Sequence, residues 1–133
     1  MTISSSLSHP ASRWALDHMP LTAQAVRELS PALSGKRLAM CLHVEPKTAA
    51  LVSLLVDAGM DIALTGSPGT TKDDVADDLR SLGVHVYTTQ SDGEAEHVRN
   101  IEKGLEHDPD LTLDNGADLT LKLVNSGVPD HYI

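Results

Sequence analysis

The chain has 133 residues, ten basic and nineteen acidic side chains, and a formal net charge of −9. This length suits a single domain, and 41% apolar with 22% charged residues is a globular rather than a disordered composition. The acidic excess argues against nucleic acid as a partner, because phosphate binding depends on clustered Lys and Arg.

The N-terminal part predicts a short disordered segment followed by helix. Residues 1–11 are rich in serine and have little to bury, so we expect them to be disordered, with one domain over residues 12–133. From Ser12 to about Leu29 apolar residues recur at helical spacing. Pro20 interrupts this pattern, which predicts either one kinked helix or two short ones.

Short apolar runs then alternate with helical segments. Predicted strands cover residues 37–43, 61–65, 84–88 and 111–113. Predicted helices cover about 47–58, 72–82 and 94–106, and a last one begins near residue 117. This alternation predicts βαβ crossovers, and therefore an α/β, Rossmann-like three-layer domain with a short parallel sheet of about four strands flanked by helices.

Polar residues follow each predicted strand. Ligands of open parallel α/β sheets bind at the carboxyl ends of the strands, where the βα loops and the helix N-termini meet. The candidate catalytic residues there are His43, Glu45, Lys47, Asp114, Asn115 and Asp118. The candidate ligand-binding residues are Thr48, Thr65, Ser67 and Thr71.

These candidates also have plainer explanations. A hydrogen bond to backbone accounts for His43, and a solvated ion pair accounts for Glu45 and Lys47. Helix capping, which favours Ser, Thr, Asp and Asn, accounts for Thr70, Thr71, Asp92 and Asn115. No local spacing matches a metal signature, a phosphate loop or a dinucleotide fingerprint, so we expect neither a metal nor a cofactor.

The single cysteine, Cys41, lies in the apolar run 38–42, which excludes an internal disulfide and predicts a buried thiol. No apolar run approaches the roughly 18 residues that a membrane span needs. The N-terminus also lacks the basic and apolar regions of a signal peptide. We therefore expect a cytoplasmic protein that does not associate with membranes.

Three segments in order carry a family resemblance. They are Arg37 to His43, which ends in Cys-Leu-His, Thr71 to Ala76, and Leu113 to Thr120. They resemble the S-adenosylhomocysteine hydrolase (adenosylhomocysteinase) family, whose substrate domain has similar Cys-Leu-His, Ser-Thr-Gln-Asp-Asp-Val-Ala and Asp-Asp-Gly-Gly-Asp-Leu-Thr segments. The resemblance runs from residue 14 to about residue 124 and covers the first part of that domain.

The resemblance implies a pocket for an adenosyl group, with changes at several contact positions. His43 and Thr48 keep the family's residue types. Glu45 stands where the family has a ribose-contacting Thr, and Lys47 where it has an adenine-contacting Glu. Asn115 stands at an Asp of the family's acid/base machinery, and an amide cannot exchange a proton as a carboxylate does.

The sequence ends before the family's Glu-Glu-Thr-Thr-Thr-Gly segment, its catalytic Lys and Asp, and its NAD-binding domain. We therefore expect no NAD-dependent hydrolysis of S-adenosylhomocysteine. One remaining function is a repurposed biosynthetic enzyme, or enzyme component, that acts on a small polar or nucleoside-like metabolite. The other is a non-catalytic regulatory module that binds adenosine, S-adenosylhomocysteine or a protein partner. Uncovered apolar surface predicts a homo-oligomer or a hetero-partner.

Overall fold

The structure is a computed structural model that describes residues 7–127. Its elements in chain order are α1 (Pro10–Asp17), α2 (Pro20–Leu33), β1 (Arg37–Cys41), α3 (Pro46–Asp57), β2 (Asp61–Thr65), α4 (Asp73–Ser81), β3 (His85–Val86), α5 (Glu94–Glu106), β4 (Leu111–Asp114) and α6 (Asp118–Ser126). Within the described range no helix has the length and apolar character needed to cross a bilayer.

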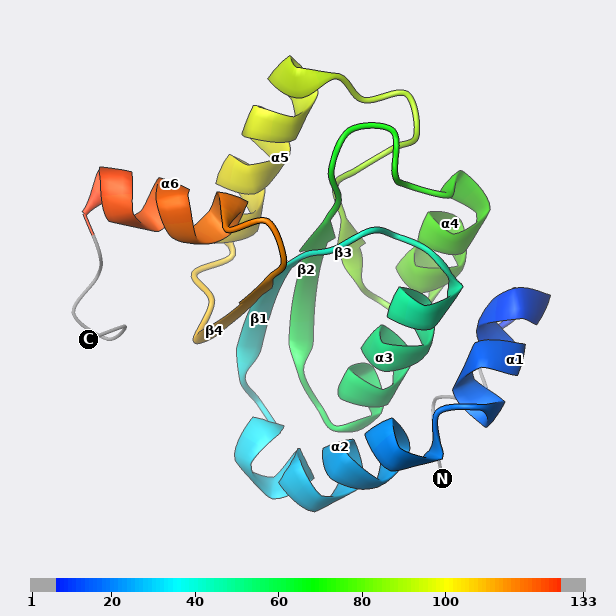
Figure 1. Cartoon of the computed structure of the whole chain (residues 1–133). Helices are drawn as coiled ribbons and strands as arrows, with labels where there is room; N and C mark the ends of the chain where they lie inside the picture. The colour runs from blue at the N-terminus through cyan, green and yellow to red at the C-terminus, as the bar shows by residue number, and fades with distance from the viewer. Residues whose placement is uncertain (1–6, 128–133) are drawn as a thin grey trace.

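The strands form one parallel sheet in the order β3-β2-β1-β4. The chain moves in one direction from β1 through α3 to β2, and through α4 to β3. It then returns through α5 to β4 at the opposite edge (Figure 1). Right-handed crossovers place α3 and α4 on one face and α5 on the other, where α6 packs against it. The predicted Rossmann-like three-layer domain is confirmed.

Side chains of β1 alternate between the two faces of the sheet. Leu38 and Met40 join the larger apolar core beneath α3 and α4. Ala39 and Cys41 join a smaller cluster with Ile101 of α5. The strand therefore supplies both cores, and Cys41 lies on the α5 face of the sheet.

The helix ends follow from local chemistry. Gly59 and Gly83, just after α3 and α4, have φ of 90° and 89°, a left-handed conformation that favours glycine. Pro31 lies inside α2 and cannot donate a hydrogen bond to the carbonyl of Arg27. The hydroxyl of Ser30 donates to that carbonyl instead, at 3.0 Å. This substitute bond satisfies the carbonyl near the end of α2.

The N-terminal segment differs from the prediction of disorder. Leu7 is only 1% exposed, and the backbone N–H groups of Ser8 and His9 donate to the Asp78 carboxylate at 3.0–3.1 Å. Residues 7–11 are therefore ordered, because α4 holds them, whereas residues 1–6 of the prediction lie outside the described residues. Of the two helical alternatives, two short helices are correct, since Pro20 starts α2.

Two strands are shorter than predicted. β1 ends at Cys41 rather than at residue 43, and β3 contains only residues 85 and 86. Beyond β3 the Arg80 side chain donates to the carbonyls of Val86 and Thr88 at 3.0–3.3 Å. A guanidinium thus satisfies carbonyl groups at the end of this edge strand.

Candidate functional site at the carboxyl edge of the sheet

Three side chains form a row across the carboxyl edge. The parallel register pairs Cys41 with Thr65 of β2 and with Asp114 of β4. Paired residues of a parallel sheet point to the same face, so all three side chains lie on the face of α5 and α6. We call Thr65, Cys41 and Asp114 the Cys41 row. β1 and β4 also form a topological switch point, because the helices that follow them cover opposite faces.

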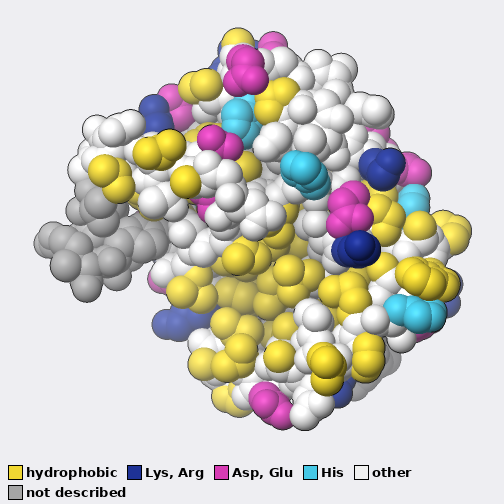
Figure 2. All heavy atoms as spheres, in the orientation of Figure 1, with side chains coloured by type: hydrophobic (Ala, Val, Ile, Leu, Met, Phe, Trp, Pro, Cys, Tyr) yellow, Lys and Arg dark blue, Asp and Glu magenta, His cyan; other side chains and the backbone are white. Residues whose placement is uncertain are grey.

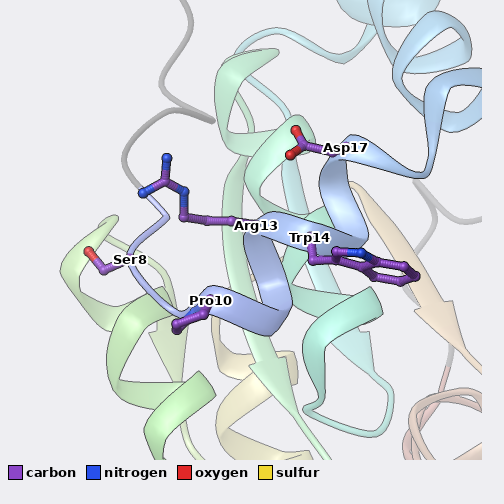
Figure 3. A pocket seen from close by; sticks show the side chains of 5 residues that line it. All are labelled: Ser8, Pro10, Arg13, Trp14 and Asp17. Carbon is purple, nitrogen blue, oxygen red and sulfur yellow. The ribbon is translucent and has the colours of Figure 1, made fainter.

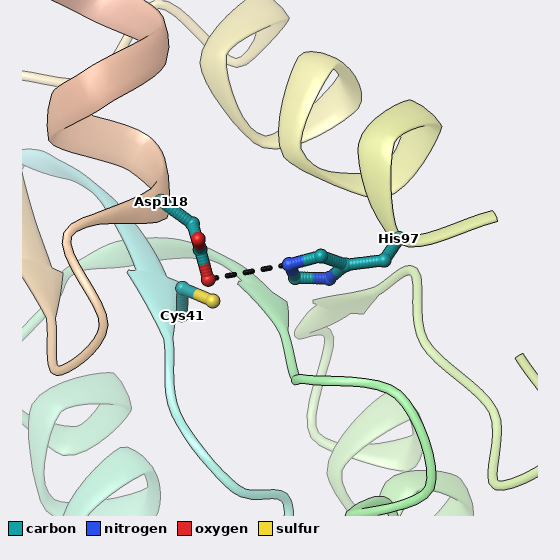
Figure 4. Close-up of side chains that lie close together, drawn as sticks. All are labelled: Cys41, His97 and Asp118. Carbon is teal, nitrogen blue, oxygen red and sulfur yellow. Dashed lines mark hydrogen bonds and ion pairs between the residues drawn. The ribbon is translucent and has the colours of Figure 1, made fainter. Parts of the chain in front are cut away.

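His97 of α5 and Asp118 of α6 lie against this row (Figure 4). His97 Nε2 is 3.2 Å from Asp118 Oδ2, and Nδ1 of the same ring is 3.0 Å from the Gly66 carbonyl oxygen. A carbonyl oxygen can only accept, so Nδ1 carries a hydrogen and directs Nε2 toward the carboxylate. His97 is 8% exposed, and because both partners are acceptors, the bond at Nε2 forms only with a hydrogen on Nε2 or on the Asp118 carboxyl group. The orientation of the ring is therefore fixed for proton exchange at Nε2.

Two polar atoms of the Cys41 row have no hydrogen-bond partner in the described part of the chain. They are Thr65 Oγ1 and Asp114 Oδ1, both buried. An unpaired buried polar group costs about 1–3 kcal/mol, so such groups are rare and call for a water or a ligand. The row therefore presents hydrogen-bonding capacity that the protein itself does not use.

The Cys41 thiol is not a nucleophile in this environment. Burial, with smaller contributions from the charges of Asp114 and Asp118, raises the pKa of Cys41 to about 12. The thiol is therefore protonated at neutral pH, which agrees with the predicted buried cysteine. Donor atoms of Cys41, His97 and Asp118 lie within 4.8 Å of one another, but a metal there would first have to displace the thiol proton.

The candidates that follow β1 lie around the start of α3. Glu45 is the N-cap of α3, and its carboxylate accepts from the Thr48 N–H at 3.0 Å and from the Thr48 hydroxyl at 3.4 Å. His43 and Lys47 are exposed. Among residues 7–127 no hydrogen bond joins the His43 side chain to a backbone group, and no ion pair joins Glu45 to Lys47. The structure thus shows neither of the contacts that the plainer explanations invoked. No hydrogen bond or ion pair in that range joins His43, Glu45 or Lys47 to the Cys41 row, whereas the predicted residues Thr65, Asp114 and Asp118 lie in the row or beside it.

Capping does not explain the residues to which it was assigned. The N-cap positions of α4, α5 and α6 hold Lys72, Gly93 and Ala117. Thr71 instead shares a 2.8 Å hydrogen bond with the buried hydroxyl of Thr88. Ser67 of the predicted ligand-binding set is half-buried, and Asn115 of the predicted catalytic set is exposed.

Carboxylates occupy three helix N-termini at this edge. Glu45 caps α3, as described above. At the start of α5, Glu96 accepts from the Gly93 N–H at 2.9 Å. Asp114 Oδ2 accepts from the N–H groups of Leu119 and Thr120 at 2.7 and 3.2 Å at the start of α6. Backbone hydrogen bonds lower the pKa of Glu96, which keeps it ionised. These carboxylates disfavour an anion at the starts of α3, α5 and α6.

His97 was not among the predicted site residues. It lies inside a predicted helix and belongs to no motif. A signal was nevertheless available, because His97, Ile101 and Gly104 recur at i, i+4 and i+7 and form the buried stripe of α5. Asn100 is the other polar member of this buried stripe, and polar residues at buried helical positions identify polar groups that face the sheet.

Two surface pockets lie away from the Cys41 row. One, of about 360 Å³, is lined by Ser8, Pro10, Arg13, Trp14 and Asp17. The side chains of Arg13 and Trp14 point to different sides of α1, so this pocket is a shallow surface (Figure 3). Another, of about 370 Å³, lies between α5 and α6. Neither contains a predicted site residue.

A parallel α/β sheet with unpaired polar atoms beside its switch point defines a Rossmann-like domain with a candidate ligand-binding edge. The family model described as S-adenosyl-L-homocysteine hydrolase matches residues 14–131. The chain belongs to the S-adenosyl-L-homocysteine hydrolase family, as its segments suggested.

Similar proteins include two kinds of hydrolase. S-inosyl-L-homocysteine hydrolase of Methanopyrus kandleri is 43% identical over 121 residues, which cover 88% of this chain and 28% of that protein. The protein of the same name from Methanocaldococcus jannaschii is 39% identical, over 84% of this chain and 28% of its own length. Adenosylhomocysteinase of Thermotoga maritima is 40% identical, over 81% of this chain. The chain spans about 28% of the length of these relatives.

Proposed function

We propose that this chain binds an uncharged nucleoside-like metabolite at the Cys41 row, in the cytoplasm, and acts on it by acid/base chemistry without NAD. The observation that carries this proposal is the pair of unpartnered buried atoms, Thr65 Oγ1 and Asp114 Oδ1, next to the His97–Asp118 pair. A hydroxyl can donate and accept, and a carboxylate oxygen accepts. Together they suit the hydroxyl and amino groups of a ribose or a purine.

The charges at the edge favour an uncharged ligand over a phosphorylated one. Carboxylates already occupy the N-termini of α3, α5 and α6, where an anion would otherwise bind. The names of the relatives refer to inosyl and adenosyl groups, which derive from the uncharged nucleosides inosine and adenosine. We therefore expect a nucleoside or its thioether rather than a nucleotide.

In this proposal His97 and Asp118 carry the proton that the ligand gains or loses in the reaction. Asp118 keeps 38% of its side chain exposed, so the pair can exchange a proton between the ligand and solvent. His43, Lys47 and Asn115, which were predicted as catalytic residues, are exposed at the same edge, and we propose them as ligand contacts. Glu45 contributes mainly by holding the start of α3.

Calorimetry with adenosine, inosine, S-adenosylhomocysteine and AMP tests this function. Thr65→Val removes only a hydroxyl that has no partner, so we expect native stability with nucleoside binding weakened by about tenfold. Thr88→Val is the matched control, because its hydroxyl pairs with Thr71. We expect this variant to lose stability and to keep its affinity.

For any nucleoside that binds, turnover followed by NMR separates enzyme from binding module. Asp118→Asn should keep most of the affinity and lose the turnover, because an amide does not transfer the proton. The proposal fails if no nucleoside binds at millimolar concentration, or if AMP binds more tightly than adenosine.

A second candidate function, a partner-binding module, rests on exposed apolar side chains. Leu111 and Leu113 of the edge strand β4 are 44% and 39% exposed, and Leu121 and Val124 of α6 are 56% and 60% exposed. Hydrophobic side chains also gather between α6 and α2 on the face shown in Figure 2. An open strand edge with apolar neighbours favours association, with a second copy or with another protein. Sedimentation showing a monomer at all concentrations and no partner on pull-down would exclude this candidate.

A further inference from the structure

A second group of ligating side chains lies at the opposite end of the sheet from the Cys41 row. Asp61 begins β2, His85 begins β3, and His107 is the C-cap of α5. One ligand atom from each of these residues lies within 4.8 Å of the others. Two imidazoles and one carboxylate from three separate elements thus converge on one point.

The distances between these atoms suit a metal better than a hydrogen bond. His85 Nε2 is 3.5 Å and His107 Nε2 is 3.6 Å from the same oxygen, Asp61 Oδ1. A charge-assisted hydrogen bond measures about 2.7–2.9 Å, so neither contact is one. Zinc bonds of about 2.0–2.2 Å in a tetrahedron place neighbouring ligand atoms about 3.4 Å apart. The two observed separations lie close to that edge length.

The surroundings of the cluster favour a cation. His107 lies at the C-terminus of α5, where the helix carbonyls carry partial negative charge. The side chains of His85 and Asp61 are 53% and 54% exposed, so an ion can enter from solvent. The His85 and His107 rings lie 5.5 Å apart at a tilt of 56°, so the two imidazoles adjoin each other beside Asp61.

We infer that Asp61, His85 and His107 form a surface site for a divalent transition-metal ion, with zinc the best fit. His107 Nε2 donates to the Asp61 carbonyl oxygen at 3.1 Å, because a carbonyl can only accept, so zinc binding must replace this bond and move the hydrogen of the neutral ring to Nδ1. Three protein ligands leave the fourth position of the ion for water. The ion would connect β2, β3 and α5, and would therefore stabilise the fold rather than serve the Cys41 row.

Thermal unfolding and calorimetry of the metal-free full chain with Zn²⁺ test the site. We expect Zn²⁺ to raise Tm and Mg²⁺ to leave it unchanged, because imidazole ligands suit Zn²⁺. His85→Ala should weaken Zn²⁺ binding by more than about tenfold. Loss of a residue that merely hydrogen-bonds to a metal ligand already lowers metal affinity by about tenfold or more, and His85 would be a ligand itself. This variant should fold, because His85 is half exposed.

Two controls separate this cluster from the other histidines. His43→Ala should bind Zn²⁺ as the native chain does. His97→Gln removes one possible ligand of the other group, Cys41, His97 and Asp118, and should also bind Zn²⁺ as the native chain does. Co²⁺ added to the isotopically labelled chain should broaden the NMR signals of Asp61, His85 and His107. An unchanged Tm with Zn²⁺, an unchanged affinity in His85→Ala, or a loss of binding in His97→Gln alone would overturn the inference.

Discussion

His97 receives a fixed orientation from two partners, with Nδ1 at 3.0 Å from the Gly66 carbonyl oxygen and Nε2 at 3.2 Å from Asp118. Because the carbonyl cannot donate, we predict that Nδ1 carries a hydrogen in every protonation state of the folded protein. Long-range proton–nitrogen NMR reports this directly. A neutral ring with its only hydrogen on Nε2 would contradict the prediction.

The Cys41 thiol should resist alkylation. Burial and the nearby Asp114 and Asp118 raise its pKa to about 12, so at pH 8 almost no thiolate forms in the folded protein. We expect iodoacetamide to react only as fast as the protein unfolds, and rapidly in urea, where the pKa returns to about 8.5. Mass spectrometry measures both rates. Rapid native modification at pH 8 would show that the thiol is more accessible than the structure indicates.

Asp114 should stabilise α6 as well as bind a ligand. Its Oδ2 accepts from the N–H groups of Leu119 and Thr120, whereas the N-cap residue makes no side-chain bond. We expect Asp114→Ala to lower the free energy of unfolding by about 1–2 kcal/mol, the usual cost of a lost cap. Asp114→Asn retains an acceptor oxygen and should lose less. Equal losses in urea unfolding of the two variants would argue against capping.

Ala117 has a left-handed backbone, with φ of 62°. That conformation costs a residue with a Cβ about 1 kcal/mol relative to glycine, so Ala117→Gly should raise the free energy of unfolding by about 0.5–1 kcal/mol. Ala25→Gly is the matched control, because Ala25 lies in α2 and glycine there should destabilise by about 1 kcal/mol. Urea unfolding that shows both variants destabilised would count against strain at residue 117.

Glu45 should behave as a helix cap. Glu45→Ala removes the acceptor of the Thr48 N–H and should cost about 1 kcal/mol of unfolding free energy. Serine is a good N-cap, so Glu45→Ser should recover most of this loss. If Glu45→Ser is as unstable as Glu45→Ala in urea unfolding, the carboxylate has a role beyond capping.

The order and type of the elements could be predicted from the sequence, because each depends on short-range patterns. The helix over 94–106 and the strand over 61–65 have the predicted bounds. β3 was predicted too long, since Arg80 meets Val86 and Thr88 only after the chain has folded. Residues 7–11 were predicted to be disordered because their partner, Asp78, is distant in sequence.

The candidate site also combines features that the sequence predicts with features that only the folded structure shows. The amino-acid sequence by itself determined the family, the parallel α/β class and the presence of Thr65, Asp114 and Asp118 at strand and helix ends, since these follow from local pattern. Tertiary structure alone decided that the register aligns Cys41 with two of them and that α5 brings His97 to Asp118. Side-chain direction depends on which face each helix covers, and that depends on the packing of the whole sheet.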